Sequence, residues 1–435
     1  MTRHARILFT LSLVLVPAAV RAESPAFDVK AIDAFVADHV KEKKFVGLSL
    51  AVLRHGEPAL VKAYGKRSLE DGSPVDLDTK FAIGSVTKQF VCACALLLAE
   101  DGKLAVQDKV AKWYPNLTRA GDISLYDLMS HCSGYPDYYP LDFIDRRLEK
   151  PIALDRLIQE YATGKLDFEP GTRWSYSNTG YIILGRIVEK VSGKSLGEFL
   201  GNRVFQPLGM ANSTFEPKQT ATGLARGYTS FMLGPLEPAV PEAAGWCHAA
   251  GGIWSTAGDL IKWDLGLMTG KVLKPDSFRL MTTPRLLATG KSKGYGCGLS
   301  IATQNGERVL AHGGAVSGFH TRNILLPGAK SAIAISANSE VVEVEPIVKF
   351  VAERLIAKDD GPDVAVPKIQ GLSAKEAARE LFRQMAKGEI DRAKLGEEYS
   401  HYLTAERVRA AKERLQPLGE PDAVVVEHTA ERGGM

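Results

Sequence analysis

Apolar residues recur with a helical period in the middle of the chain and with a strand-like period near its beginning and towards its end. Residues 31–40 have the spacing of an amphipathic helix. The apolar run 46–53, a turn at His55–Pro58 and a returning run over 59–64 predict a β-hairpin. From Tyr295 the period changes to two. That change predicts four short strands and a closing helix, at 297–302, 308–311, 319–326, 332–336 and 344–357.

The segment between the hairpin and Tyr295 is mostly helical in pattern. The predicted helices run from Ser85 to near Gly102, over 106–113, from 123 to before Ser133, after Tyr181, and over 258–268 with Ser255 or Thr256 as the cap. Because strands flank a long helical stretch, the simplest packing joins the early and late strands in one antiparallel sheet. We therefore expect an α+β fold: an antiparallel sheet flanked by helices, with a mostly helical insertion.

Turn-forming residues at Asp359–Pro362 mark a boundary near the end of the chain. Beyond it, residues 374–387 and 404–415 are helical in pattern, and 423–428 predict a single strand. The expected division is a main domain over 23–360 and a small α+β appendage over 361–435, to which the sequence assigns no role.

The first 22 residues have the pattern of a secretory signal. A positively charged start precedes an apolar run over 7–16, and Val20–Ala22 offers small residues for cleavage. The run is shorter than the roughly 20 residues that span a bilayer. We expect export to the periplasm or the medium, cleavage after Ala22 and no stable membrane span.

Composition narrows the choice of partners. Without Arg3, Arg6 and Arg21 of the leader, the 54 basic residues fall to 51, equal to the 51 acidic residues, so a nucleic-acid partner is not expected. The five cysteines cannot all pair, and we interpret most of them as small buried apolar residues. The scattered histidines form no metal motif, and no cofactor is expected.

Ser85 and Lys88 are the strongest candidates for chemistry. On a helix that begins at Ser85, Lys88 lies one turn further on the same face, so its amine can reach the serine hydroxyl. A serine hydroxyl needs a nearby base before it becomes a good nucleophile, and a lysine can be that base if burial or other positive charge lowers its pKa. The Ser85 N–H, at a helix start, would be available to an oxyanion.

Two downstream motifs supply partners for this pair. In the first, the Tyr176 hydroxyl could pass a proton to a leaving group, and the Asn178 amide could donate to and accept from a substrate. The second is His312-Gly313-Gly314 at the end of a predicted strand, where glycine permits close approach of a ligand. There His312 would supply a proton or an intermittent charge, and the N–H of Ala315 would be a second oxyanion donor.

Together these motifs resemble the serine β-lactamase and penicillin-recognising superfamily, from about residue 27 to 357. The nearest branch contains class C β-lactamases, D-Ala-D-Ala carboxypeptidases, D-aminopeptidases and related esterases. The resemblance rests on Ser85–Lys88, on Tyr176–Asn178 and on His312–Gly314 in the slot usually held by Lys-Thr-Gly, with two similar flanking strings at 128–134 and 251–259.

The resemblance implies an acyl-enzyme mechanism with Ser85 as nucleophile, Lys88 and Tyr176 as base and acid, and Asn178, His312, Gly314 and Ala315 contacting the substrate. Because His312 replaces a permanent cation, efficient β-lactamase activity is not expected. We expect hydrolysis of esters or small peptides, D-amino-acid peptides being one option, with weak β-lactam turnover at most. The alternatives are a D-Ala-D-Ala carboxypeptidase and a penicillin-binding or peptidoglycan-sensing protein. The oligomeric state is left open.

Overall fold

The computed structural model describes residues 27–139, 146–230, 234–356, 374–392, 395, 400 and 403–421. The expected signal at 1–22, the boundary at 359–362 and the strand at 423–428 lie outside these residues. Among the described residues, no helix has both the length and the apolar character needed to cross a membrane.

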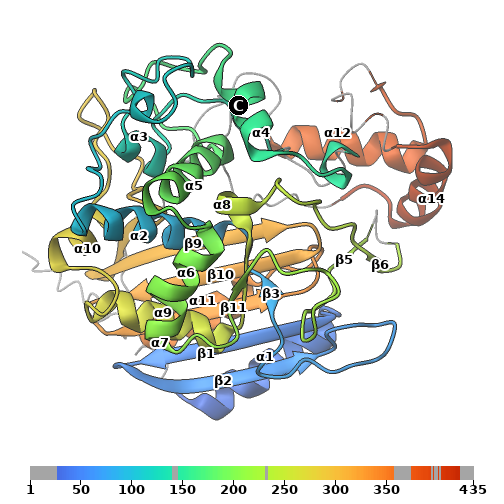
Figure 1. Ribbon diagram of the computed structural model, residues 1–435. Coiled ribbons are helices and arrows are strands. Elements are labelled where there is room, and N and C mark those ends of the chain that lie inside the picture. Colours follow the sequence, from blue (N-terminus) through green and yellow to red (C-terminus); the bar gives the residue numbers. More distant parts are fainter. Residues whose placement is uncertain are drawn as a thin grey trace, which may run out of the picture.

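A six-stranded antiparallel sheet runs through the main domain in the order β2-β1-β11-β10-β9-β8 (Figure 1). The early hairpin therefore joins the late strands, as the sequence predicts. The strands are β1 (Gly47–Arg54), β2 (Glu57–Gly65), β8 (Ser300–Gln304), β9 (Glu307–Val316), β10 (Phe319–Leu326) and β11 (Ser331–Ala337). In the central pair, Leu50 of β1 lies opposite Ile335 of β11.

Both faces of the sheet are covered, which explains why β1 and β11 are almost continuously apolar. Successive residues of β11 alternate between two cores: Ala334 belongs to the larger core beneath the helical insertion, and Ile335 to the core beneath the terminal helices. On that second face Phe35 of α1 (Val29–Glu42) stacks on Phe350 of α11 (Glu345–Leu355) at 3.8 Å between ring centroids.

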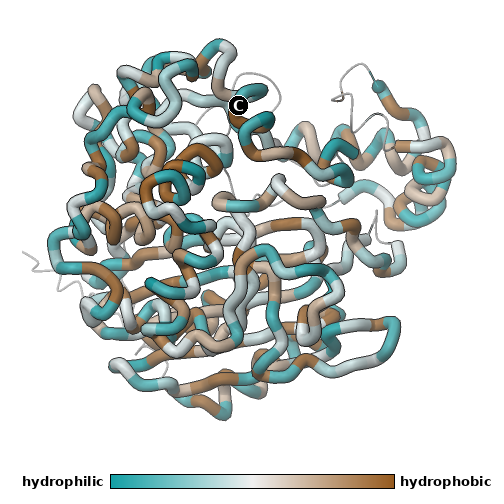
Figure 2. The backbone as a smooth tube through the Cα atoms, in the orientation of Figure 1, coloured by the Kyte–Doolittle hydropathy of each residue, from teal (hydrophilic) through white to brown (hydrophobic). Residues whose placement is uncertain are grey.

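The helical part packs on the opposite face of the sheet, with the buried α2 (Thr87–Glu100) between the strands and the outer helices (Figure 1). Hydrophobic stretches follow the strands and α5, and the outer loops are largely hydrophilic (Figure 2). The other longer helices of this part are α4 (Leu154–Ala162), α5 (Asn178–Ser192), α9 (Ala257–Met268) and α10 (Pro275–Met281). Shorter ones are α3 (Leu125–Met129), α6 (Leu196–Leu200), α7 (Gln206–Leu208) and α8 (His248–Gly251).

Single turns and short strands complete the main domain. The turns are η1 (Gly84–Val86), η2 (Val110–Lys112), η3 (Arg146–Glu149) and η4 (Gly201–Phe205). The short strands are β3 (Phe81–Ala82), β4 (Thr214–Phe215), β5 (Tyr228–Thr229), β6 (Glu237–Pro238) and β7 (Ile253–Ser255).

Three sequence expectations for the main domain are wrong in detail. No helix forms over 106–113 beyond the single turn η2, because the N–H of Val110 donates to the carbonyl of Ile123 instead of to its own turn. The strand expected at 297–302 begins later, at Ser300, since Gly298 has a φ of +72°. The strand expected to end at Ala311 continues to Val316.

The described part of the tail contains α12 (Ala374–Lys387), α14 (Ala405–Leu415) and the turn η6 (Gln416–Leu418). These two helices confirm the helical predictions for the tail, and they pack on each other around their own apolar cluster, which includes Met385 and Leu415. The division at 360 stays a prediction.

Candidate active site

Ser85 and Lys88 lie where the sequence predicts, at the entrance to the buried helix α2. Ser85 is in the single turn η1, and Lys88 follows in the first turn of α2. The Nζ of Lys88 is 2.9 Å from the Oγ of Ser85. Lys88 is fully buried, whereas Ser85 is partly exposed at the edge of a cavity. The pair thus has the arrangement of a nucleophile with an adjacent base.

Two carbonyl oxygens fix the direction of the lysine amine. Lys88 Nζ donates to Asn178 Oδ1 and to the backbone oxygen of Ala250, each at 2.7 Å. A carbonyl oxygen can only accept, whereas the Ser85 hydroxyl has a hydrogen to give. When Lys88 is a neutral amine, its two N–H groups are therefore directed to the carbonyls, and its lone pair is directed to Ser85. This orientation is the one that proton removal from Ser85 requires.

Asp137 fixes the orientation of the Asn178 amide. Both carboxylate oxygens of Asp137 lie 3.1 Å from Asn178 Nδ2, and Oδ1 also accepts the backbone N–H of Asn178 at 3.0 Å. Because a carboxylate only accepts, it faces the NH₂ group and leaves Oδ1 directed at Lys88. Asn178 is the first residue of α5, and the Ser177 side chain caps this helix by accepting the N–H of Gly180.

Tyr176 lies beside the same amine. The centroid of its ring is 4.8 Å from Lys88 Nζ and 4.2 Å from the ring of His131. His131 Nδ1 accepts the backbone N–H of Ser177 at 3.0 Å, which fixes the segment that carries Tyr176. The structure therefore brings Tyr176 to Lys88, and its role in proton transfer stays a prediction.

The end of β9 lies against η1 and contributes Ala315 and Val316 to the wall of the site. Strand β8 pairs with β9 only as far as Ala311, so residues 312–316 have one edge facing the Ser85 turn. A Cβ at Gly314 would lie 2.0 Å from the carbonyl oxygen of Ile83 and 3.2 Å from the Ser85 nitrogen. This close approach requires glycine at position 314. It also places Ala315 on the wall of the same cavity as Ser85, which suits the predicted pair of oxyanion donors.

His312 differs from expectation in position and in charge. It lies inside β9, is buried, and contacts Tyr295 Oη through Nε2 at 2.9 Å and the Gly313 carbonyl oxygen through Nδ1 at 2.5 Å. Since the carbonyl can only accept, Nδ1 carries the hydrogen and Nε2 accepts from Tyr295. Burial, reinforced by the charge of Lys88, lowers the His312 pKa to about 3. The expected intermittent charge is therefore wrong near neutral pH.

The cavity at Ser85 has an aromatic side. Tyr138, Tyr139 and Trp246 line it together with Ser85. Tyr138 Oη donates to the Trp246 carbonyl, and Tyr139 Oη donates to Glu242. Sequence reasoning missed this aromatic side, Asp137 and the Ala250 carbonyl. The available signal for Asp137 was its place three residues after Gly134, the end of one of the flanking strings.

The cysteines lie mostly in the core of the protein. The five cysteines are all free, and Cys92, Cys94, Cys132 and Cys297 are buried, which confirms their interpretation as apolar core residues. Cys247 is partly exposed and lines the cavity. Within the described ranges, no group of three or more His, Cys, Asp or Glu side chains could hold a metal ion.

Comparisons with known proteins agree with this geometry. A D-aminopeptidase from Brucella anthropi is 29% identical over 297 residues, which are 67% of this chain and 56% of the relative. The chain thus spans little more than half the length of the curated relatives it matches.

Among solved structures, a D-amino acid amidase from Ochrobactrum anthropi SV3, complexed with D-phenylalanine, has a TM-score of 0.65 at 25% identity and covers 75% of this chain and 98% of its own. An octameric penicillin-binding protein homologue from Pyrococcus abyssi has a TM-score of 0.67 at 25% identity, and covers 83% and 82% of the two chains. The family model described as Beta-lactamase matches residues 32–358. This match, over the whole segment that carries the sheet, the buried helix and the Ser85–Lys88 pair, shows that the chain belongs to the β-lactamase family.

Proposed function

We propose that this protein is an exported serine hydrolase that cleaves amides, short peptides or esters of D-amino acids with a free α-amino group, through an acyl-enzyme. The observation that carries the proposal is the connected series Ser85–Lys88–Asn178–Asp137, in which each contact is 3.1 Å or shorter. It combines a nucleophile, an oriented base and a fixed negative charge in one partly exposed site.

The series supports a two-step reaction. Neutral Lys88 takes the proton of Ser85 as Oγ attacks the substrate carbonyl, and the N–H groups of Ser85 and Ala315 stabilise the oxyanion. The proton then passes to the leaving amine or alcohol, directly or through Tyr176, and leaves Ser85 acylated. Water, activated by the same base, hydrolyses the ester and restores the serine.

The charges near Ser85 favour an ammonium over a carboxylate on the substrate. Asp137 contributes a negative charge next to Asn178, and His312 is neutral at physiological pH. A β-lactam, whose carboxylate needs a positive partner, is therefore a poor fit, and an α-ammonium group is a good one. The names of the relatives, D-aminopeptidase and D-amino acid amidase, support D-configured substrates. The leader-like residues 1–22 support export.

The test compares D- and L-phenylalanine p-nitroanilides and their N-acetyl derivatives, using wild type, Ser85→Ala and Asp137→Asn. We expect Ser85-dependent hydrolysis of the free-amine D substrate. Asp137→Asn should lower kcat/KM for that substrate about 10- to 100-fold, the value of a charge-assisted hydrogen bond, and should change the N-acetyl substrate much less.

Equal loss on both substrates would show that Asp137 acts only through Asn178. Preference for the N-acetyl or L substrates would refute the substrate class. A long-lived penicilloyl adduct on Ser85, seen by intact mass, would instead favour a penicillin-binding or sensing role.

A further inference from the structure

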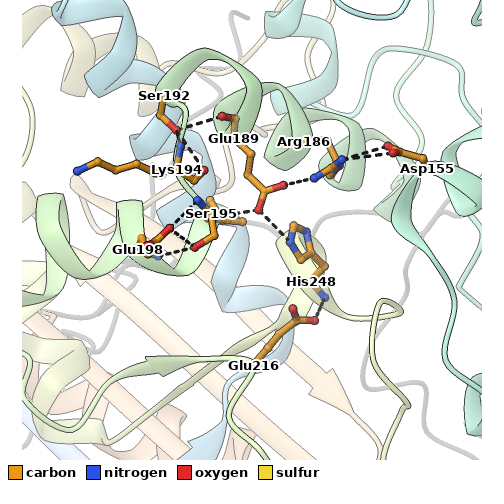
Figure 3. A network of polar contacts seen from close by, with 10 residues as sticks. Asp155, Arg186, Glu189, Ser192, Lys194, Ser195, Glu198, Glu216 and His248 are labelled. Atoms are coloured by element: carbon orange, nitrogen blue, oxygen red, sulfur yellow. Dashed lines mark hydrogen bonds and ion pairs between the residues drawn. The ribbon is translucent and has the colours of Figure 1, made fainter.

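A partly buried polar network lies beside the helix that supplies one of the carbonyls of Lys88. Figure 3 shows Glu189 of α5 between Arg186 and His248. Glu189 Oε2 accepts from Arg186 Nη1 at 2.6 Å, and Oε1 accepts the N–H of Leu196 at 2.9 Å. Oε1 also lies 3.7 Å from His248 Nε2. Burial alone would raise the Glu189 pKa, but the contacts with His248, Leu196 and Arg186 together lower it to about 2.

His248 is held on several sides. Its backbone N–H donates to Glu216 Oε1 at 3.2 Å, and its ring meets the ring of Phe215 edge-on at 5.2 Å between centroids. The residue is 5% exposed, and its Nδ1 has no hydrogen-bond partner among the described residues. Its φ is +28°, outside the regions that a non-glycine residue favours. Such a conformation persists only where surrounding contacts impose it.

The single turn α8 connects His248 to the reacting atoms. Two residues after His248, the Ala250 carbonyl accepts from Lys88 Nζ. Helix α8 also lies directly against α5, since a Cβ at Gly185 would be 2.3 Å from the Cβ of Ala249. Helix α5 begins with Asn178, the source of the second carbonyl. Both carbonyls that direct the Lys88 amine are therefore attached to α5, one of them through α8 and its contact with Glu189.

We propose that His248 is a positioning residue: held by Glu189, it fixes α8 so that the Ala250 carbonyl keeps the lone pair of Lys88 directed at Ser85. Without this contact the backbone at 248 can relax, and the carbonyl of Ala250 turns with it. The amine then loses one of the carbonyl acceptors that orient it, and proton transfer from Ser85 slows. A displacement of about 1 Å in such an arrangement can cost about 100-fold in rate.

The proposal rests on the proposed use of Lys88 as the base, but its test does not need the proposed substrate. A fluorophosphonate is attacked by Ser85 Oγ at phosphorus, fluoride leaves with the electron pair of the P–F bond, and the serine proton passes to Lys88 and then to solvent. The second-order rate constant of this reaction measures the activation of Ser85. Ser85→Ala gives the background, and a wild type that is phosphonylated but inert to D-amino acid anilides would refute the substrate while leaving this test intact.

The informative variants are His248→Phe, which keeps a ring of similar size without nitrogen, and His248→Gln, which keeps an N–H near the place of Nε2. Both variants keep a non-glycine residue at position 248, so the unfavourable φ of +28° there must still be imposed by surrounding contacts. Asp155→Asn is the matched control, because Asp155 contacts Arg186 at 3.3 Å at the exposed end of the same network. All are assayed for phosphonylation rate, for kcat and KM on the substrate found, and for thermal unfolding.

We expect His248→Phe to lower the phosphonylation rate and kcat about 10- to 100-fold, with less than about a threefold change in KM. His248→Gln should retain at least about a third of the wild-type phosphonylation rate and of the wild-type kcat. Asp155→Asn should match wild type. If His248→Phe does not fold, Glu189→Gln carries the test and should show the same separation of kcat from KM. A folded His248→Phe or Glu189→Gln with wild-type phosphonylation would overturn the proposal, as would a fall in Asp155→Asn equal to theirs.

Discussion

Adding a single methyl group at Gly314 should disable the site without disturbing the sheet. A Cβ there would lie 2.0 Å from the carbonyl oxygen of Ile83, whereas real Cβ atoms essentially never come within 3.0 Å of such an atom. In Gly314→Ala, the end of β9 and the Ser85 turn must therefore separate by about 1 Å or more. That separation moves Ala315 away from Ser85, so the predicted oxyanion donors no longer converge. A misplacement of this size costs about 100-fold in rate, or about 2.7 kcal/mol in activation free energy.

Gly313→Ala is the matched control for this prediction. A Cβ at Gly313 would meet first the end of the flexible Arg322 side chain, at 3.3 Å, and points to the other face of the strand. We expect Gly314→Ala to lose about 100-fold in kcat/KM and in phosphonylation rate, and Gly313→Ala to stay within about threefold of wild type. Circular dichroism and thermal unfolding should show both variants folded. Full activity in a folded Gly314→Ala would refute the assignment of this strand edge to the oxyanion site.

Two further predictions follow from pKa shifts. The pKa of His312 is about 3 in the fold and near 6.5 in an unfolded chain, so the unfolded state binds more protons between these values. The free energy of unfolding should therefore fall as pH drops from about 6.5 towards 3. Urea unfolding of His312→Gln should show a shallower dependence of this free energy on pH, and an unchanged dependence would contradict the shift. Burial raises the pKa of Cys92 to about 12, so iodoacetamide at pH 8 should leave Cys92 unmodified until the protein is denatured, as peptide mass mapping would show; rapid labelling of folded protein would contradict its burial.

The parts of the fold that were predictable are those set by short-range patterns. Strand β10 has the predicted bounds 319–326, and Thr256 caps α9 by accepting the N–H of Asp259. The segment 106–113 has helical spacing but no helix, because Val110 and its neighbours find backbone partners across the chain. Periodicity reports which residues are buried, and it does not report which distant backbone group competes for a hydrogen bond.

The same distinction applies to the site. Ser85 and Lys88 were found because their contact is local, one helical turn apart. His312 was predicted at the end of a strand and with an intermittent charge, whereas it lies inside β9. Burial and the charge of Lys88 lower its pKa, and its own motif reveals neither of them. Asp137 was missed because the role of a single carboxyl group depends on its contact with the Asn178 amide, 41 residues away in the sequence.

The Ala250 carbonyl is the hardest of these groups to predict, because every residue has one and no side chain distinguishes it. Its position depends on two features elsewhere in the chain. Glycine at 185 allows α8 to approach α5 closely, and His248 contacts Glu189. The orientation of the Lys88 amine thus depends on residues outside the Ser85–Lys88–Asn178 group. Substitutions at 185 or 248 should then resemble damage to the base, and they should do so without changing Ser85, Lys88 or Asn178.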